Sequence, residues 1–240
     1  STLSVADLNV AISAANSATG GTGTVFSLSA GATINTGAES EFTTLLGYET
    51  ASQITISDQS ITVDSGELSV SNANLLDTTT TGTVTATIAS SSVDTLKTLT
   101  GTNAYTITIA SGDATGSTAA EFNTINAATS LAVNASAVTG LASDTAANIK
   151  TLLTAGNDTA QFTGASFGSL ATAVVSDTTL SGSDLAGAID QANTATGGTG
   201  TVFTISAVDT ITGSEANFTA LLTDEGLSLI HISEPTRPLT

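Results

Sequence analysis

Short segments in which hydrophobic and polar residues alternate recur along the chain. β-Branched residues fill many of the hydrophobic positions, as is typical of strands. The pattern predicts strands at residues 25–28, 54–56, 84–88, 105–109, 131–133 and 202–205, with a shorter one at 161–163. Residues 54–70 alternate over a longer stretch and predict two or three strands in succession. Most of these strands follow one another at intervals of roughly 22 to 30 residues, a spacing typical of repeat proteins.

Ala-rich stretches lie between most of the predicted strands, with apolar residues three and four positions apart. This spacing places the apolar residues on one face of a helix. A Ser precedes the clearest stretches, and its hydroxyl can accept a hydrogen bond from a free amide of the first turn. The expected N-caps are Ser4, Ser117, Ser143, Ser183 and Ser214. Helices of about ten residues are marginal alone, so each needs a sheet or a neighbouring helix to pack on.

The sequence also contains a long internal duplication. Residues 3–34 align with residues 180–211 without a gap at an offset of 177, with 21 identities in 32 positions. With one deletion the match continues, from EFTTLLG at 41–47 to NFTALLT at 217–223. We therefore expect residues 1–179 to form a first long repeat of about six to seven coils, and residues 180–226 to begin a second.

The repeating unit suggested by these patterns is a strand, a turn, a short helix and a turn, over about 26 residues. Links between parallel strands are almost always right-handed. The sequence therefore predicts a right-handed parallel β-solenoid with short helices in its coils. The alternative is an all-β parallel β-helix in which the helix-like stretches are only turns. The Ser-preceded, Ala-rich stretches favour the first of these.

The charge balance narrows the range of functions. The chain has 21 Asp and Glu against three Lys and Arg, for a net charge of −18, and it has no Cys. So few cations cannot neutralise phosphates, which excludes nucleic acid as a partner, and anionic membrane surfaces would repel the chain. No apolar run approaches the ~20 residues of a membrane span. Strong acidity is typical of proteins in salty or extracellular surroundings, so we expect an extracellular or cell-surface location.

The chain offers few groups for catalysis. Its cations are Lys97, Lys150 and Arg237, and its one histidine is His231. Residues 227–240, LSLIHISEPTRPLT, resemble the in-frame translation of a sequencing adapter, so we expect a non-native tail and a natural protein that continues beyond it. Without this tail no His or Arg remains, and Ser-His-Asp catalysis is excluded. We expect both lysines on exposed helix faces, no catalytic residues and no enzyme activity.

Calcium is the one cofactor that the composition suggests, because many acids with few basic partners could supply oxygen ligands. The candidate ligands are Asp58 with Asp64, and Asn157 with Asp158. However, the Gly-rich stretches at 20–24 and 197–201 lack the aspartates of calcium-binding β-rolls, and no EF-hand loop is present. The simpler interpretation is that these residues form turns and caps, so we expect no bound cofactor.

Two segments resemble known families. Residues 144–149, DTAANI, with Leu152 and Leu153, are similar to Thr/Ala-rich repeats of giant bacterial surface proteins, the haemolysin-type or adhesin-like proteins of marine bacteria and cyanobacteria. Residues 183–193, SDLAGAIDQAN, followed by Val202 and Phe203, resemble the opening segment of many right-handed β-helices, although its usual Arg is absent.

These resemblances imply an extracellular structural or adhesive role. Together with the composition, they lead us to expect an extracellular structural repeat protein without catalysis, a rod- or filament-forming segment of a bacterial surface protein. Its expected partners are copies of itself, associating end to end or with neighbouring repeats. The alternative is a calcium-dependent or carbohydrate-binding adhesin module.

Overall fold

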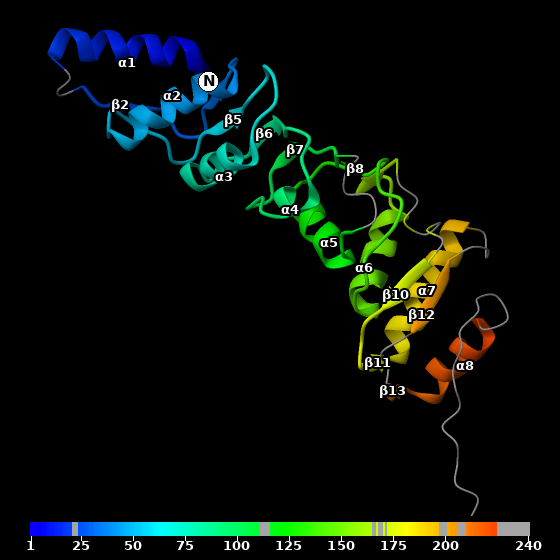
Figure 1. Cartoon of the computed structure of the whole chain (residues 1–240). Helices are drawn as coiled ribbons and strands as arrows, with labels where there is room; N and C mark the ends of the chain where they lie inside the picture. The colour runs from blue at the N-terminus through cyan, green and yellow to red at the C-terminus, as the bar shows by residue number, and fades with distance from the viewer. Residues whose placement is uncertain are drawn as a thin grey trace, which may run out of the picture. The chain divides into compact units, whose positions relative to one another are not determined.

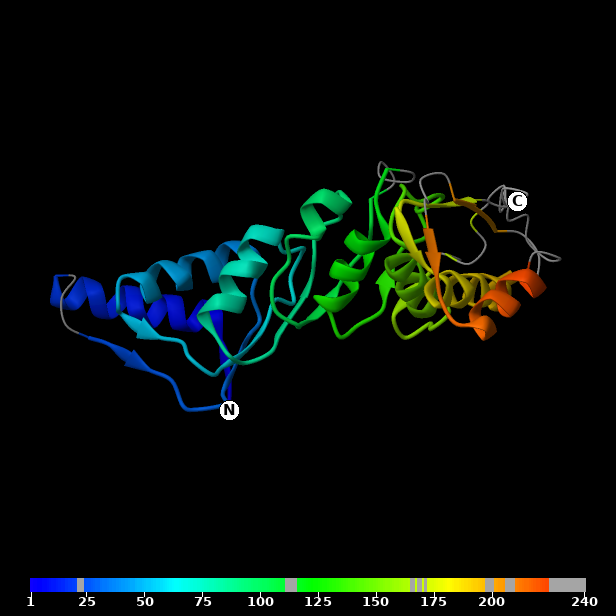
Figure 2. The same cartoon turned by 90° about the horizontal axis from the view of Figure 1, so that it is seen from below.

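The computed structural model describes residues 1–20, 24–110, 116–164, 167, 170, 172–196, 201–205 and 210–224 (Figures 1 and 2). The chain divides into two compact units. Unit 1 comprises Ser1–Ala110 and Ile125–Asn134, and unit 2 comprises Ser111–Thr124 and Ala135–Thr240. Helix α5 (Ala119–Ala127) runs across this division. Unit 2 therefore contains both the end of the first long repeat and the start of the second.

Unit 1 is built on a five-stranded parallel sheet. Its strands, in spatial order, are β1 (Thr2–Ser4), β3 (Thr33–Asn35), β5 (Ser60–Thr62), β6 (Val84–Thr87) and β7 (Ala104–Thr106). The first four are each followed by a helix: α1 (Val5–Thr19), α2 (Glu39–Thr50), α3 (Val70–Thr79) and α4 (Val93–Leu96). The unit also contains β2 (Phe26–Ser27), β4 (Ile54–Thr55) and β8 (Val133–Asn134). Strands β2 and β4 pair in parallel, and α1 and α2 lie side by side in both views.

An aliphatic column fixes the register of the sheet in unit 1. Leu3 lies opposite Ile34, Ile34 opposite Ile61, and Ile61 opposite Val84. The last three of these side chains are fully buried. Complete burial of an isoleucine or valine stabilises a fold by roughly 1.5–3 kcal/mol, and a slip of one residue would turn the whole column away from the core. The column therefore holds strands of only three or four residues in one register.

Unit 2 contains two short parallel sheets and a row of helices. Its elements are α6 (Ala146–Gly156), β9 (Phe162–Thr163), β10 (Thr172–Val175), β11 (Thr179–Ser181), α7 (Gly182–Thr196), β12 (Val202–Ile205), β13 (Thr210–Thr212) and α8 (Glu215–Asp224). Strand β10 pairs with β12, and β11 with β13. Helix α7 packs against α6 on one side and against α8 on the other. Phe122 and Phe162 both contact Phe167 in the core, at centroid distances of 5.4 and 5.0 Å.

The elements at the start of the chain occur a second time. Strand β1, helix α1 and strand β3 have counterparts 177 residues later in β11, α7 and β13. Helix α2 has its counterpart in α8, with its first residue moved from Glu39 to Glu215. The pairing of β11 with β13 repeats the register of β1 with β3, since Leu180 faces Ile211 as Leu3 faces Ile34. Equivalent residues can therefore be compared in two surroundings within one chain.

The prediction of a right-handed parallel β-solenoid with coils of about 26 residues is wrong, and so is the all-β parallel β-helix. The part of the chain that the structure describes is mixed α/β, with eight helices, one five-stranded sheet and several two-stranded parallel sheets. Two physical reasons account for this. The Ala-rich stretches form true helices, up to 15 residues long in α1. The spacing is also not constant: paired residues are 31 positions apart between β1 and β3 (Leu3 and Ile34), but 19 apart between β6 and β7 (Ala86 and Tyr105).

Candidate interaction surfaces

The two lysines of the described chain are both engaged in ion pairs. Lys97 donates to Asp94 at 2.5 Å on α4, and Lys150 of α6 donates to Asp184 of α7 at 3.1 Å. Both pairs are at least partly exposed to solvent, where such pairs contribute little to stability. His231, Arg237 and the whole predicted tail, residues 227–240, lie outside the described residues.

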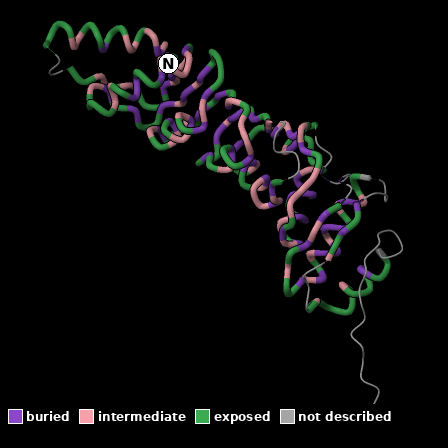
Figure 3. The backbone as a smooth tube through the Cα atoms, viewed as in Figure 1, coloured by how far each residue is buried: buried purple, intermediate pink, exposed green. Residues whose placement is uncertain are grey.

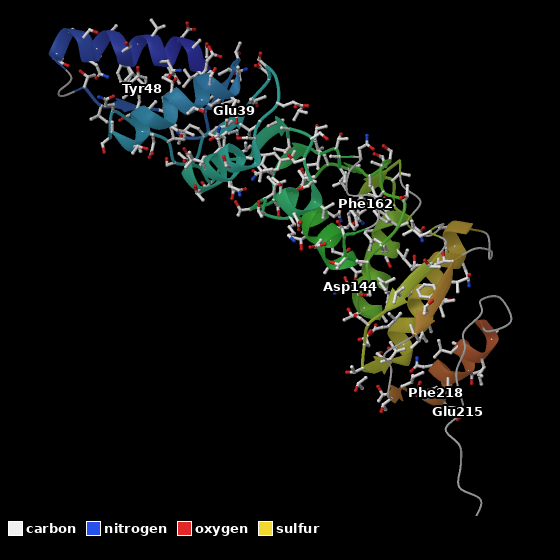
Figure 4. All side chains as sticks on the ribbon, viewed as in Figure 1. Glu39, Tyr48, Asp144, Phe162, Glu215 and Phe218 are labelled. Atoms are coloured by element: carbon white, nitrogen blue, oxygen red, sulfur yellow. The ribbon has the colours of Figure 1, made fainter. Side chains whose placement is uncertain are left out.

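Three carboxylates bind the N-terminal ends of helices other than their own. Glu39 of α2 accepts from the backbone and hydroxyl of Ser69, the N-cap of α3. Asp144 accepts from the amide of Ala120 in α5 at 2.7 Å, and Asp177 from the amide of Ala146 in α6 at 2.7 Å. Glu39 and Asp144 are labelled in Figure 4. The first amides of a helix lack partners within it and carry partial positive charge, so these acids are stabilised without cations.

Glu39 shows the electrostatic effect of such binding. The hydrogen bond from the Ser69 hydroxyl, helped by the Ser69 amide and the Asn72 side chain, holds the pKa of the Glu39 carboxyl below its usual range against partial burial. The Asn72 amide donates to the same Glu39 oxygen at 2.7 Å. Glu39 therefore has a structural role, because its hydrogen bonds connect α2 to the N-terminal end of α3.

The candidate calcium ligands take part in local turn structure. Asp58 accepts from the Gly31 amide at 3.2 Å and from the Gln59 side chain at 2.8 Å, while Asp64 is exposed between β5 and α3. The Asn157 side-chain amide donates to Gln191.

Asp158 accepts from the amide of Ala160 at 2.9 Å and from the side chain of Gln161 at 3.2 Å. These bonds hold the pKa of Asp158 below its usual range. Among the described residues no three His, Cys, Asp or Glu side chains gather where they could hold a metal ion. The expectation of no bound calcium at the four candidates stays a prediction.

Asparagine side chains bridge successive helices in both units. Asn9 of α1 donates to the Glu41 carbonyl of α2, at 2.9 Å. Asn123 of α5 donates to the Asn148 carbonyl of α6, at 3.1 Å. Asn74 of α3 donates to the Thr98 carbonyl just beyond α4, and Asn157, the C-cap of α6, donates to the Gln191 carbonyl of α7. Each amide thus links one helix to main chain in or beside the next through a directional hydrogen bond.

The face of α8 that its counterpart α2 buries is largely open. Phe42, Leu45 and Leu46 of α2 correspond to Phe218, Leu221 and Leu222 of α8. Phe218 is 37% exposed, whereas Phe42 is 1% exposed. Leu222 is 63% exposed, whereas Leu46 is 5% exposed. Figure 4 labels Phe218 on α8. We call Phe218 and Leu222 the α8 face.

Helix α1 is likewise exposed at positions that its counterpart α7 buries. Leu8, Ala11 and Ala15 are exposed or partly exposed. Figure 3 shows α1 largely in the colours of exposed and intermediate residues. Their counterparts are the fully or nearly fully buried Leu185, Ala188 and Ala192. Val10 is 69% exposed, and its counterpart Gly187 lies against the stem of Lys150. We call Leu8, Ala11 and Ala15 the α1 face.

Two strand edges accompany these helix faces. Within the described ranges β1 pairs only with β3, and β13 pairs only with β11. Strand β3, the counterpart of β13, pairs on both edges, with β1 and with β5. The outer edges of β1 and β13 therefore present backbone donors and acceptors that could accept another parallel strand.

Comparison with known proteins finds no matching family model, no similar curated protein and no similar solved structure. No helix of the described segments is both long enough and apolar enough to span a membrane.

Proposed function

We propose that this chain is an extracellular structural repeat protein without catalytic activity, and that it works by associating with further copies of its repeat to form filaments. The observation that carries the proposal is the internal duplication, because β1, α1, β3 and α2 recur along the chain as β11, α7, β13 and α8. The register of β1 with β3 is repeated by β11 with β13. Repeat units of this kind bury their apolar surfaces against neighbouring copies.

The use of the charged groups supports a structural role. Glu39, Asp144 and Asp177 bind helix N-termini, and both lysines pair with acids on α4 or α7. The net charge of −18 supports the proposed extracellular location. Buried amides and hydroxyls complete backbone hydrogen bonds, as Asn103 does for Val84.

Sedimentation velocity over a concentration series tests the proposal. A filament-forming repeat protein should show a weight-average mass that rises with concentration beyond 23.5 kDa, and negative-stain images should show elongated assemblies. A single species of 23.5 kDa at every concentration up to about 1 mM would contradict the proposal. Such a result would mean that the association free energy is weaker than roughly −4 kcal/mol.

A further inference from the structure

The junction between the two long repeats lies inside unit 2, where the helices on both sides of it are described. Helix α6 and strand β10 belong to the end of the first long repeat, whereas α7 and β12 belong to the start of the second. Helix α6 packs against α7, and β10 pairs in parallel with β12. The chain therefore shows how the end of one long repeat meets the start of the next.

We propose, on the basis of the proposed function, that the end of one long repeat recognises the start of the next through three positions of α7. These recognition residues are Asp184, Gly187 and Gln191, and they accept Lys150 of α6 and its C-cap Asn157. They are spaced three and four residues apart, so they lie along one face of the helix. The partner that this face fits is another repeat of the same kind, ending in a helix with Lys and Asn at these places.

The charge contact is selective because cations are rare in this chain. The Lys150 ammonium donates to the Asp184 carboxylate at 3.1 Å, and both side chains are partly exposed. Lys97, by contrast, pairs with Asp94 of its own helix. A neighbouring helix without an acid at the place of Asp184 would leave Lys150 without this partner. The ion pair therefore selects a partner more than it stabilises one.

The missing side chain at Gly187 makes room for the lysine stem. A Cβ atom at this position would lie 2.8 Å from Cε and 3.0 Å from Cδ of Lys150. Such contacts are closer than packed side chains allow, so a larger residue would push the stem aside and break the ion pair with Asp184. Gly is unfavourable in a helix interior, and the close approach of Lys150 gives a physical reason for its presence in α7.

An amide contact adds a third match at the end of α6. The Asn157 side chain donates to the main-chain carbonyl of Gln191 at 2.9 Å and to its side-chain oxygen at 3.1 Å. The main-chain bond can form with any residue at this place in α7. The side-chain bond needs a residue that carries an acceptor there.

Helix α1, the counterpart of α7, lacks most of this match. Of the three recognition residues it keeps only the acid, as Asp7, and has Val10 and Ala14 at the other two places. A valine would collide with a lysine stem placed as in α6, and an alanine offers no side-chain acceptor. An α6-type helix should therefore accept α7 and fit poorly against a helix with the residues of α1.

Grafting residues of α1 onto α7 tests the match. The α1-like graft combines Gly187→Val with Gln191→Ala, at the two recognition positions that differ. The control graft combines Asp190→Ser with Thr194→Ser, which also introduces residues of α1, but at exposed positions. Val and Ala are better helix formers than the Gly and Gln that they replace, so a weaker junction in the α1-like graft cannot arise from helix propensity.

A buried cysteine reports the opening of the junction, because the sequence contains no other Cys. Ala188→Cys places the thiol in α7, and Ala155→Cys places it in α6 as a second reporter. The rate at which a thiol reagent labels the native monomer measures how often the helix separates from its neighbours. The α1-like graft should raise both rates about fivefold or more, and the control graft should change them less than about twofold. Circular dichroism checks the fold of each variant.

The variant Lys150→Ser separates recognition from general packing. Where the lysine stem has been removed, Gly187→Val has nothing to collide with, so it should raise the labelling rates little. Where Lys150 is present, the same substitution should raise them several-fold. Lys97→Ser removes a lysine from α4 instead and should give no such rescue.

The outcomes separate this inference from the proposed function. Faster labelling in the α1-like graft, with the Gly187→Val effect cancelled by Lys150→Ser, would support recognition through α7. An α1-like graft that is labelled like its control, or a Gly187→Val effect that persists with Lys150→Ser, would overturn the recognition role and leave the filament function standing. Sedimentation velocity that finds only monomer would overturn the proposed function, whatever the labelling rates show.

Discussion

Asn103 joins three parts of unit 1 through one buried side chain. Its carbonyl oxygen accepts from the Val84 amide at 2.9 Å, and its amide donates to Asp77 at 2.8 Å. Thr80 and Thr129 act in the same way, with hydroxyls that donate at 2.6 Å to the carbonyls of Gln59 and Tyr105. At the residue scale, polar side chains thus complete hydrogen bonds that very short strands leave unmade.

We predict that Asn103→Ala lowers the free energy of unfolding by about 2–3 kcal/mol, because the buried Val84 amide loses its acceptor and Asp77 loses a donor. Chemical denaturation measures the loss. Asn74→Ala is the control: this partly exposed side chain bonds Thr98 and Thr100, so its removal should cost about 1 kcal/mol or less. Equal losses in the two variants would contradict the role of Asn103.

Glu39 gives a prediction on pH. Since its pKa is lower in the folded chain than the usual 4.5, its stabilising effect is present above pH 4.5 and is lost as the pH falls through the folded value. Glu39→Gln should therefore lower the free energy of unfolding by about 1 kcal/mol at pH 7, and by much less near pH 2.5. Denaturant titrations at both pH values test this, with the exposed Glu67→Gln as a control that should change little at either. A Glu39→Gln loss as large at pH 2.5 as at pH 7 would refute the assignment.

The sequence predicts the role of some of the residues that form such hydrogen bonds, but not of others. Ser4 and Ser214 cap their helices as expected. The remaining caps lie one or two residues away from the expected Ser117, Ser143 and Ser183, at Thr118, Thr145 and Ser181. In a chain so rich in Ser and Thr, several neighbouring hydroxyls can cap a given turn, so composition gives the cap type but not its position. The buried role of Asn103 depends on Asp77, which only the fold brings near.

At the scale of elements, the aromatic contacts of Phe167 hold unit 2 together. Phe167 is fully buried and contacts both Phe122 and Phe162. We predict that Phe167→Ala lowers the free energy of unfolding by about 3–5 kcal/mol, through lost burial and the cavity left behind. Phe218→Ala, tested at a concentration where the protein is monomeric, is the matched control and should cost about 1 kcal/mol or less, because Phe218 is largely unpacked. Similar thermal midpoints for the two variants would rule the prediction out.

The predicted strands match observed strands of four residues and of two. The strand expected at 202–205 is β12, the one expected at 84–88 contains β6, and those expected at 25–28 and 161–163 contain β2 and β9. By contrast, β1, β3 and β13 were not predicted, because they lie outside the segments in which alternation was recognised. Residues 54–70 contain β4 and β5 but end at the start of α3, whose helical spacing begins only at Val70.

At the scale of the whole molecule, like charge opposes the proposed assembly. A chain with a net charge of −18 repels its copies, and salt screens that repulsion. Raising NaCl from about 0.1 to about 1 M shortens the screening length from about 10 to about 3 Å, so the association constant should rise several-fold. Sedimentation velocity measures it, with sucrose at equal osmolality as a control. Weaker association in salt would contradict an apolar contact, and a response specific to calcium would favour the adhesin alternative.

The fold class could not be predicted from the repeated pattern, because the pattern gave neither the lengths of the helices nor the residues at which successive strands pair. The duplication did show which residues correspond, such as Leu46 with Leu222. It did not show that one lies in a core and the other at a surface, since that difference arises from neighbours and not from the residues themselves. The candidate surfaces therefore needed the structure, while the expectation of no catalysis rests on composition alone.

The double occurrence of one helix gives the molecule an internal reference for amide hydrogen exchange. Helix α7 packs against two helices, α6 and α8, whereas α1 packs against α2. In monomeric protein, amides of α1 should therefore exchange faster than the equivalent amides of α7, since local opening costs less where fewer apolar contacts are lost. The ratio of the two rates, read from one spectrum under one condition, measures the free energy that a covering neighbour adds to this helix.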